Sequence, residues 1–130
     1  MTVELWMLFW AVVLTLVQMV VAVTLAIPQV GMAALAGNRE GVTYEGMADR
    51  GLRAHRNMLE SLVLFAALVI AAHLAGLSNA TSAFGAQIFV IARLVYAVVY
   101  LIGIPWLRTG VWAIGLIGLL MVGSVFLTAS

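Results

Sequence analysis

The sequence predicts an all-α fold, an integral membrane four-helix bundle in which residues 1–130 form a single membrane domain. Of the 130 residues, 65% are hydrophobic and 8% are charged, and a water-soluble domain with this balance could not solvate its surface. The chain holds four apolar runs of about 20 residues, the length at which a helix crosses a bilayer. No run alternates between apolar and polar residues with a period of two, so a transmembrane barrel is not predicted.

The first predicted span covers residues 5–27 and stops at Pro28, because proline removes a helix hydrogen bond. Residues 1–4 contain no basic side chain. The run also lacks a small-residue cleavage site and is too long for the core of a signal peptide. We therefore expect the run to be retained as a membrane span.

Three more spans follow. The second is predicted over residues 52–75 and the third over residues 83–104, where Pro105 closes it. The fourth is predicted over residues 108–127.

The connections between the spans predict the orientation of the chain. The first connection is long and polar and includes Arg39, Glu40 and Arg50, the second is short and uncharged, and the third carries Arg108. The first and third connections share one side of the membrane, so the distribution of Arg predicts that this side is cytoplasmic. Both termini are then on the non-cytoplasmic side.

The residue content argues against several classes of site. The formal net charge is +1, so no basic surface is predicted for a nucleic acid. The chain contains no Cys, which excludes thiolate ligands, and no two His, nor a His and a carboxylate, share a helix face at metal-binding spacing. No Ser-His-Asp set is predicted either. We expect neither a metal nor a nucleic-acid partner.

The second and third spans each carry a polar stripe. On the second span, four residues fall within an arc of about 100°: Arg53, Arg56, Asn57 and Glu60. On the third span, three residues fall within an arc of about 60°: Arg93, Tyr96 and Tyr100. At about 1.5 Å per residue, Glu60 lies about 12 Å from the start of its helix and Arg93 about 16 Å from the end of its own. Both of these helix ends are predicted to be cytoplasmic, so the stripes lie at similar depths.

The stripes hold more positive than negative charge. A charged side chain near the bilayer centre costs at least about 2.5–3.5 kcal/mol, so such residues face inward and find partners. Glu60 alone cannot neutralise three Arg, and the excess predicts an anionic small molecule, with Arg108 closing the pocket at the cytoplasmic side. Alternatively, Arg53 and Arg56 extend to the interface, and Glu60 pairs with Arg93 or with an Arg of a neighbouring chain as a packing contact.

The stretch Arg53-Ala54-His55-Arg56-Asn57-Met58-Leu59-Glu60 resembles the characteristic pattern of the MAPEG family, the membrane-associated proteins of eicosanoid and glutathione metabolism. In that pattern an Arg, an Arg-Asn pair and a Glu lie on the second of four helices. The run from Arg93 to Tyr100, followed by Pro105 and then Arg108-Thr109, is similar to the family's third helix and the start of its fourth. The resemblance covers nearly the whole chain and implies a bacterial-type, microsomal glutathione transferase-like member.

The resemblance implies a homotrimer with glutathione bound between subunits on the cytoplasmic side, in this case of a bacterial inner membrane. It implies the following glutathione-binding residues: Arg53, Arg56, Asn57, Glu60, Arg93, Tyr96 and Tyr100. Arg108, Thr109 and Tyr100 are the candidates for assisting catalysis near the sulfur, because a cation or hydroxyl donor there lowers the pKa of the thiol.

The activity implied is that of a glutathione S-transferase or peroxidase. The thiol would attack a lipophilic electrophile or hydroperoxide that enters from the membrane lipid. The alternative is a non-enzymatic protein of the same fold that binds a lipid headgroup or acts as a partner subunit.

Overall fold

The computed structural model describes residues 1–39 and 41–129, and Glu40 of the polar connection and Ser130 lie outside the described residues. The described part contains four helices and no strand. The helices are α1 (Val3–Ala36), α2 (Gly46–Leu74), α3 (Ala80–Ile102) and α4 (Pro105–Ser124). Each is long and apolar enough to cross a membrane. The prediction of an all-α membrane fold with four spans is confirmed.

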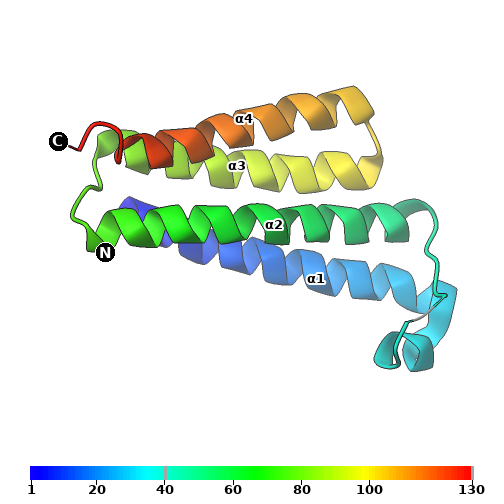
Figure 1. The fold of residues 1–130 in the computed structure, drawn as a ribbon. Coiled ribbons are helices and arrows are strands. Elements are labelled where there is room, and N and C mark those ends of the chain that lie inside the picture. Colours follow the sequence, from blue (N-terminus) through cyan, green and yellow to red (C-terminus); the bar gives the residue numbers. More distant parts are fainter. Residues whose placement is uncertain (40, 130) are drawn as a thin grey trace.

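The helices form two antiparallel hairpins that lie side by side (Figure 1). One hairpin is α1 and α2, and the other is α3 and α4, whose mutual contact is the most extensive in the bundle. Within the described residues α2 and α3 each contact all three other helices, whereas α1 and α4 do not contact each other. Both termini lie at one end of the bundle, and the α1–α2 and α3–α4 connections lie at the other (Figure 1).

Helix α1 does not stop at Pro28 as expected. The proline lies inside the helix, which continues to Ala36 and is interrupted only at Gly31, where φ is 80°. A single proline removes one hydrogen bond, and a long membrane helix tolerates that loss. Glycine adopts positive φ without the clash that a Cβ would cause. Figure 1 shows the last part of α1 turning away from the bundle axis.

The start of α2 also differs from the expected position. The helix begins at Gly46, six residues before the predicted span, so that part of the polar connection is helical. Gln29 of α1 holds this start in place, since its Nε2 donates to the Glu45 carbonyl oxygen at 2.8 Å and its Oε1 accepts from the Glu45 N–H at 2.9 Å. The first turn of α2 is therefore tied to the end of α1.

The α3–α4 connection is short because a glycine and a proline define it. Helix α3 ends before Gly103, which adopts the left-handed conformation with φ of 88°. Pro105, expected to close the third span, is the first residue of α4, a position where its missing N–H has no helical partner in any case. The turn brings the end of α3 next to the start of α4.

The core combines aromatic stacking with close helix contact. Phe65 of α2 and Phe89 of α3 stack with ring centroids 4.2 Å apart, and both are fully buried. Helices α3 and α4 cross at Gly85 and Gly118, where a Cβ on Gly118 would lie 2.6 Å from the Gly85 carbonyl oxygen. Small residues allow this approach between membrane helices. The contact fixes α4 against the face of α3 that carries the polar stripe.

Candidate functional site

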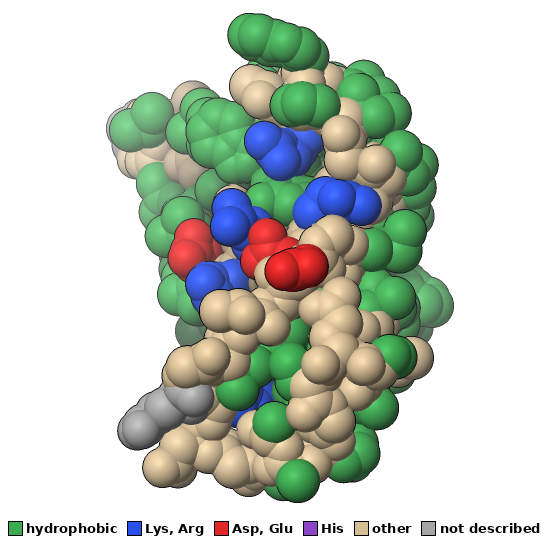
Figure 2. Space-filling view, turned by 90° about the vertical axis from the view of Figure 1, so that its right-hand side faces the viewer, with side chains coloured by type: hydrophobic (Ala, Val, Ile, Leu, Met, Phe, Trp, Pro, Cys, Tyr) green, Lys and Arg blue, Asp and Glu red, His purple; other side chains and the backbone are tan. Residues whose placement is uncertain are grey.

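Charged side chains gather at the end of the bundle that carries the α1–α2 and α3–α4 connections. Figure 2 views the molecule from this end and shows basic and acidic side chains together on it. Arg50 stabilises this end, because its Nε donates to the Leu101 carbonyl oxygen at 3.1 Å and so joins the start of α2 to the end of α3.

The most deeply buried cation is Arg93 on α3. Its side chain is 3% exposed, and its Nε and Nη2 have no hydrogen-bond partner among the described residues. The guanidinium carbon lies 4.2 Å from the centroid of the Tyr96 ring, an arrangement that favours a cation. Burying N–H groups without acceptors costs about 1–3 kcal/mol or more for a charged group. Arg93 therefore has unused capacity for an acceptor.

A row of alternating cations and aromatic rings runs from Arg93 to the start of α4. The Tyr96 and Tyr100 rings meet edge to face with centroids 5.5 Å apart. The guanidinium carbon of Arg108 lies 4.6 Å from the Tyr100 centroid. The residues predicted from the third span thus lie together, and Arg108 of α4 joins them.

The Arg93 side chain lines a hollow of about 230 Å³ between α2, α3 and α4. Asn57 and Glu60 line it from α2, and Trp112 lines it from α4. The Oδ1 atom of Asn57 is buried and has no partner among the described residues. Two unpaired hydrogen-bonding side chains and one exposed carboxylate therefore face a single space.

Arg53 and Arg56 lie elsewhere on the α2 stripe. Both line a larger hollow of about 570 Å³ next to the α1–α2 connection, with Asp49. The Nε of Arg53 is 3.0 Å from the Asp49 carboxylate, the one ion pair among the described residues. The predicted stripe is thus shared between two neighbouring hollows. The alternative pairing of Glu60 with Arg93 is not made within this chain.

Thr109 is separate from these groups. It is exposed, and its hydroxyl donates to the Pro105 carbonyl oxygen at 3.2 Å. It lines neither of the two hollows that hold the stripes. Of the three candidates for assisting catalysis, Arg108 and Tyr100 are in mutual contact and Thr109 is not part of that contact.

Sequence reasoning missed two residues of this region. Asp49 pairs with Arg53 because α2 begins early enough to include both at i, i+4 spacing, and the acidic residue four positions before an Arg was the available signal. Trp112 lines the Arg93 hollow and follows Arg108 by four residues, which places both on one face of α4. No group of three or more His, Cys, Asp or Glu that could hold a metal occurs in the described chain.

The chemistry of the site suits a molecule with several charged and polar groups. A carboxylate or carbonyl oxygen can accept from the unpaired Arg93 nitrogens, an amide N–H can donate to Asn57, and an ammonium group can pair with Glu60. Arg108 and Tyr100 add a cation and a hydroxyl at the outer end of the row. Binding of an apolar molecule would leave these groups unpaired.

Comparison with known proteins identifies a family with the same four-helix membrane fold. The model of the MAPEG family matches residues 7–127, a range that includes α2, α3, α4 and all of α1 except its first four residues. No curated protein and no solved structure matches the chain. Since the match spans nearly the whole sequence, this four-helix membrane protein belongs to the MAPEG family.

Proposed function

We propose that this chain is a membrane-embedded glutathione-dependent transferase or peroxidase that acts as a homotrimer. The observation that carries the proposal is Arg93, a buried guanidinium with two unpaired nitrogens that faces the same hollow as Asn57 and Glu60. Glutathione has two carboxylates, two amides and one ammonium group, so it complements these side chains group by group. When bound, it supplies the thiol that reacts.

Each residue then has a role set by its chemistry. The guanidinium groups of Arg93, Arg53 and Arg56 hold the carboxylates, Glu60 holds the ammonium group, and Asn57 accepts from an amide N–H. Tyr96 supports Arg93 through its ring. Arg108 and Tyr100 hold the sulfur as a thiolate, since a nearby cation and hydroxyl favour the charged form. A lipophilic electrophile or hydroperoxide reaches the sulfur from the bilayer.

The homotrimer is what the resemblance to the MAPEG family implies, and charge that α2 leaves on the surface of a single chain supports contact with a neighbouring copy. Glu60 is exposed and lies eight residues after the start of the predicted span at residue 52, about 12 Å along the helix axis. An exposed charge at such depth costs about 2.5–3.5 kcal/mol if it faces lipid. A neighbouring copy that covers α2 removes this cost and closes the hollows. Native mass spectrometry of the protein in lipid nanodiscs should show three chains.

Glutathione binding tests the proposal directly. Isothermal titration calorimetry with the purified full-length protein should give a measurable affinity that Arg56→Gln and Glu60→Gln each weaken about 10-fold or more, since hydrogen bonds to charged groups contribute about 1.5–3 kcal/mol. Arg39→Gln is the matched control, because Arg39 donates to the Leu35 carbonyl oxygen of its own segment and lines neither hollow. Equal affinities in all variants would contradict the proposal.

Activity separates the enzyme from the alternative of a non-enzymatic binding protein. Conjugation of glutathione to a generic aryl halide should be measurable by absorbance in the wild-type protein. Arg108→Gln should lower the rate at saturating glutathione more than it lowers glutathione affinity, because its proposed role is to favour the thiolate. Binding without any conjugation or peroxidase activity would favour the non-enzymatic alternative.

A further inference from the structure

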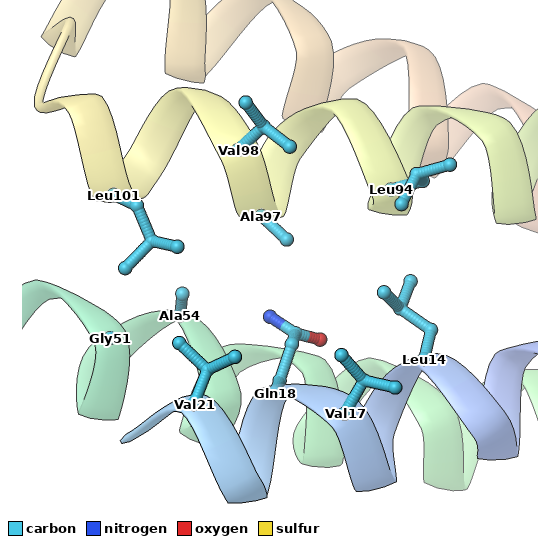
Figure 3. Close-up of a pocket in the computed structure, with 10 residues that line it drawn as sticks. All are labelled: Leu14, Val17, Gln18, Val21, Gly51, Ala54, Leu94, Ala97, Val98 and Leu101. Carbon is cyan, nitrogen blue, oxygen red and sulfur yellow. The ribbon is translucent and has the colours of Figure 1, made fainter. Parts of the chain in front are cut away.

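A second kind of hollow lies along the seam between α1 and α3. It has a volume of about 140 Å³, and Figure 3 shows its lining residues on α1, α2 and α3. Leu94 and Val98 of α3 form one wall, and Leu14 and Val17 of α1 form another. Arg93 is not among the lining residues, and it faces the separate hollow between α2 and α4. The seam is therefore distinct from the proposed glutathione site.

One polar side chain lies among these apolar walls. Gln18 is 8% exposed, and its Oε1 has no partner among the described residues. Figure 3 shows its amide directed from α1 into the space below α3. A buried amide oxygen without a partner is destabilising, and the bilayer core holds no water to pair with it. A single polar group in an apolar cavity is typical of a site that orients a small molecule.

The hollow continues along the surface of the bundle. An adjoining hollow of about 340 Å³ shares Leu14, Val17 and Leu94 and extends to Trp10. The two together run from Trp10 to Val21 on α1, a length of about 16 Å along the helix axis. Val17 and Leu94 are about half exposed, so the groove is open at the side of the bundle. Its shape suits an extended hydrocarbon chain.

The seam between α3 and α4 provides an internal comparison. It also holds a hollow, of about 240 Å³, and this one is lined by apolar residues alone, including Ile88, Ile91 and Val95. The two seams offer similar apolar surface to lipid. Only the α1–α3 seam combines that surface with a hydrogen-bonding group among its described lining residues.

We propose that the α1–α3 groove binds a lipophilic molecule that carries one hydroxyl group and enters from the bilayer. The hydrocarbon chain lies along the wall from Trp10 to Val21, and the hydroxyl pairs with the Gln18 amide. A hydroxyl both donates and accepts, so it can pair with either end of the amide. A simple alkane can fill the groove but leaves Gln18 unpaired. The site works independently of glutathione.

Photolabelling of the full-length protein in phosphatidylcholine nanodiscs tests this site. The probe is dodecanol with a diazirine in its chain, and the control probe is the matching alkane without the hydroxyl. Peptide mass spectrometry should locate saturable labelling by the alcohol at the α1–α3 seam, and unlabelled dodecanol should compete with it. Labelling at the α3–α4 seam should be weaker and unsaturable.

Substitutions distinguish the contribution of the Gln18 hydrogen bond to binding from that of the apolar groove. Gln18→Leu should weaken alcohol labelling about 3- to 10-fold, the contribution of one neutral hydrogen bond, and should leave alkane labelling and glutathione affinity unchanged. Gln87→Leu is the matched control, because Gln87 is an exposed glutamine of α3 outside the groove. Val17→Trp, a change at a half-exposed position, should abolish labelling by filling the groove, whereas Ile91→Trp in the α3–α4 seam should not.

Three outcomes would contradict the proposed site. Equal labelling by the alcohol and the alkane would show that Gln18 does not favour the hydroxyl-bearing probe. Equal labelling of the two seams would show that lipid contact alone explains the result. Cross-links from the groove to a second copy of the chain would show that protein, not a small molecule, covers it.

Discussion

The two halves of the bundle each bury a charged residue, one with a partner and one without. At the end that holds both termini, Glu4 is 4% exposed and accepts a short hydrogen bond from the Ser82 hydroxyl. The Ser82 oxygen also accepts from the Asn79 N–H at 2.8 Å, so α1 is tied to the capping box of α3. In the half nearer the α3–α4 connection, Arg93 is buried with two nitrogens unpaired among the described residues.

This difference distinguishes a structural role from a binding role. A buried polar group that is paired inside the protein stabilises the contact between the elements that pair. A buried group left unpaired contributes a cost until a partner arrives. We therefore expect changes at Glu4 and Ser82 to affect stability, and changes at Arg93 to affect ligand binding.

The largest expected effect is on ligand binding at Arg93. Arg93→Met should lower glutathione affinity about 100-fold, because two charge-assisted hydrogen bonds are lost. The free energy of unfolding should change by less than about 1 kcal/mol, since methionine fills a similar volume and the lost contact with the Tyr96 ring is offset by removal of an unpaired buried charge. Calorimetry measures the first quantity, and reversible unfolding in sodium dodecyl sulfate measures the second. A protein that loses stability but keeps its affinity would assign Arg93 a structural role.

The next effect is on stability at the opposite end. Ser82→Ala removes the hydroxyl that donates to Glu4 and should lower the free energy of unfolding by about 1.5–3 kcal/mol, the contribution of a hydrogen bond to a charged group. Glutathione affinity should not change.

The control for that change is Ser61→Ala. The Ser61 hydroxyl donates to the Met58 carbonyl oxygen of its own helix, so its loss breaks no contact between helices. Its effect on unfolding should be well below that of Ser82→Ala. Equal effects of the two substitutions would show that the link between Glu4 and Ser82 adds nothing to stability.

A third effect concerns the close contact between α3 and α4 at Gly85 and Gly118. Gly118→Ala should destabilise the protein by about 1–3 kcal/mol, because the new Cβ would lie 2.6 Å from the Gly85 carbonyl oxygen and 2.7 Å from the Phe89 nitrogen. Gly110→Ala on the same helix meets no atom within 4 Å and should be neutral or slightly stabilising. If both variants unfold at the same detergent concentration, the close α3–α4 contact is not a source of stability.

The sequence predicted the fold because it depends on hydropathy, and it predicted the composition of the third-helix stripe because that depends on helical periodicity. Hydropathy is enough to identify four spans, and 100° per residue is enough to place Arg93, Tyr96 and Tyr100 on one face. Periodicity does not report what packs against a face. The division of the α2 stripe between two hollows and the role of Trp112 both depend on how α4 lies against α2 and α3.

Helix ends were predicted less well for a related reason. The expected stop at Pro28 treats proline as a breaker, whereas the helix bends at Gly31, where the backbone freedom of glycine decides the conformation. The start of α2 at Gly46 follows from its ties to Gln29, which involve a residue 16 positions away in the sequence. Long-range hydrogen bonds of this kind leave no local pattern.

The smallest expected effect lies at the ion pair between Arg53 and Asp49, which is in the same half of the bundle as Arg93 but is not buried. The Arg53 side chain is 63% exposed, so solvent screens the pair, and i, i+4 pairs on helices contribute about 0.3–0.5 kcal/mol. Asp49→Asn should therefore shift the free energy of unfolding by no more than about 0.5 kcal/mol, a change that added salt should reduce further. A larger loss of stability would mean that the pair is covered in the assembled protein, as a neighbouring subunit over the start of α2 would cause. Repeating the measurement on cross-linked and dissociated protein separates these cases, because only subunit contact makes the effect depend on assembly.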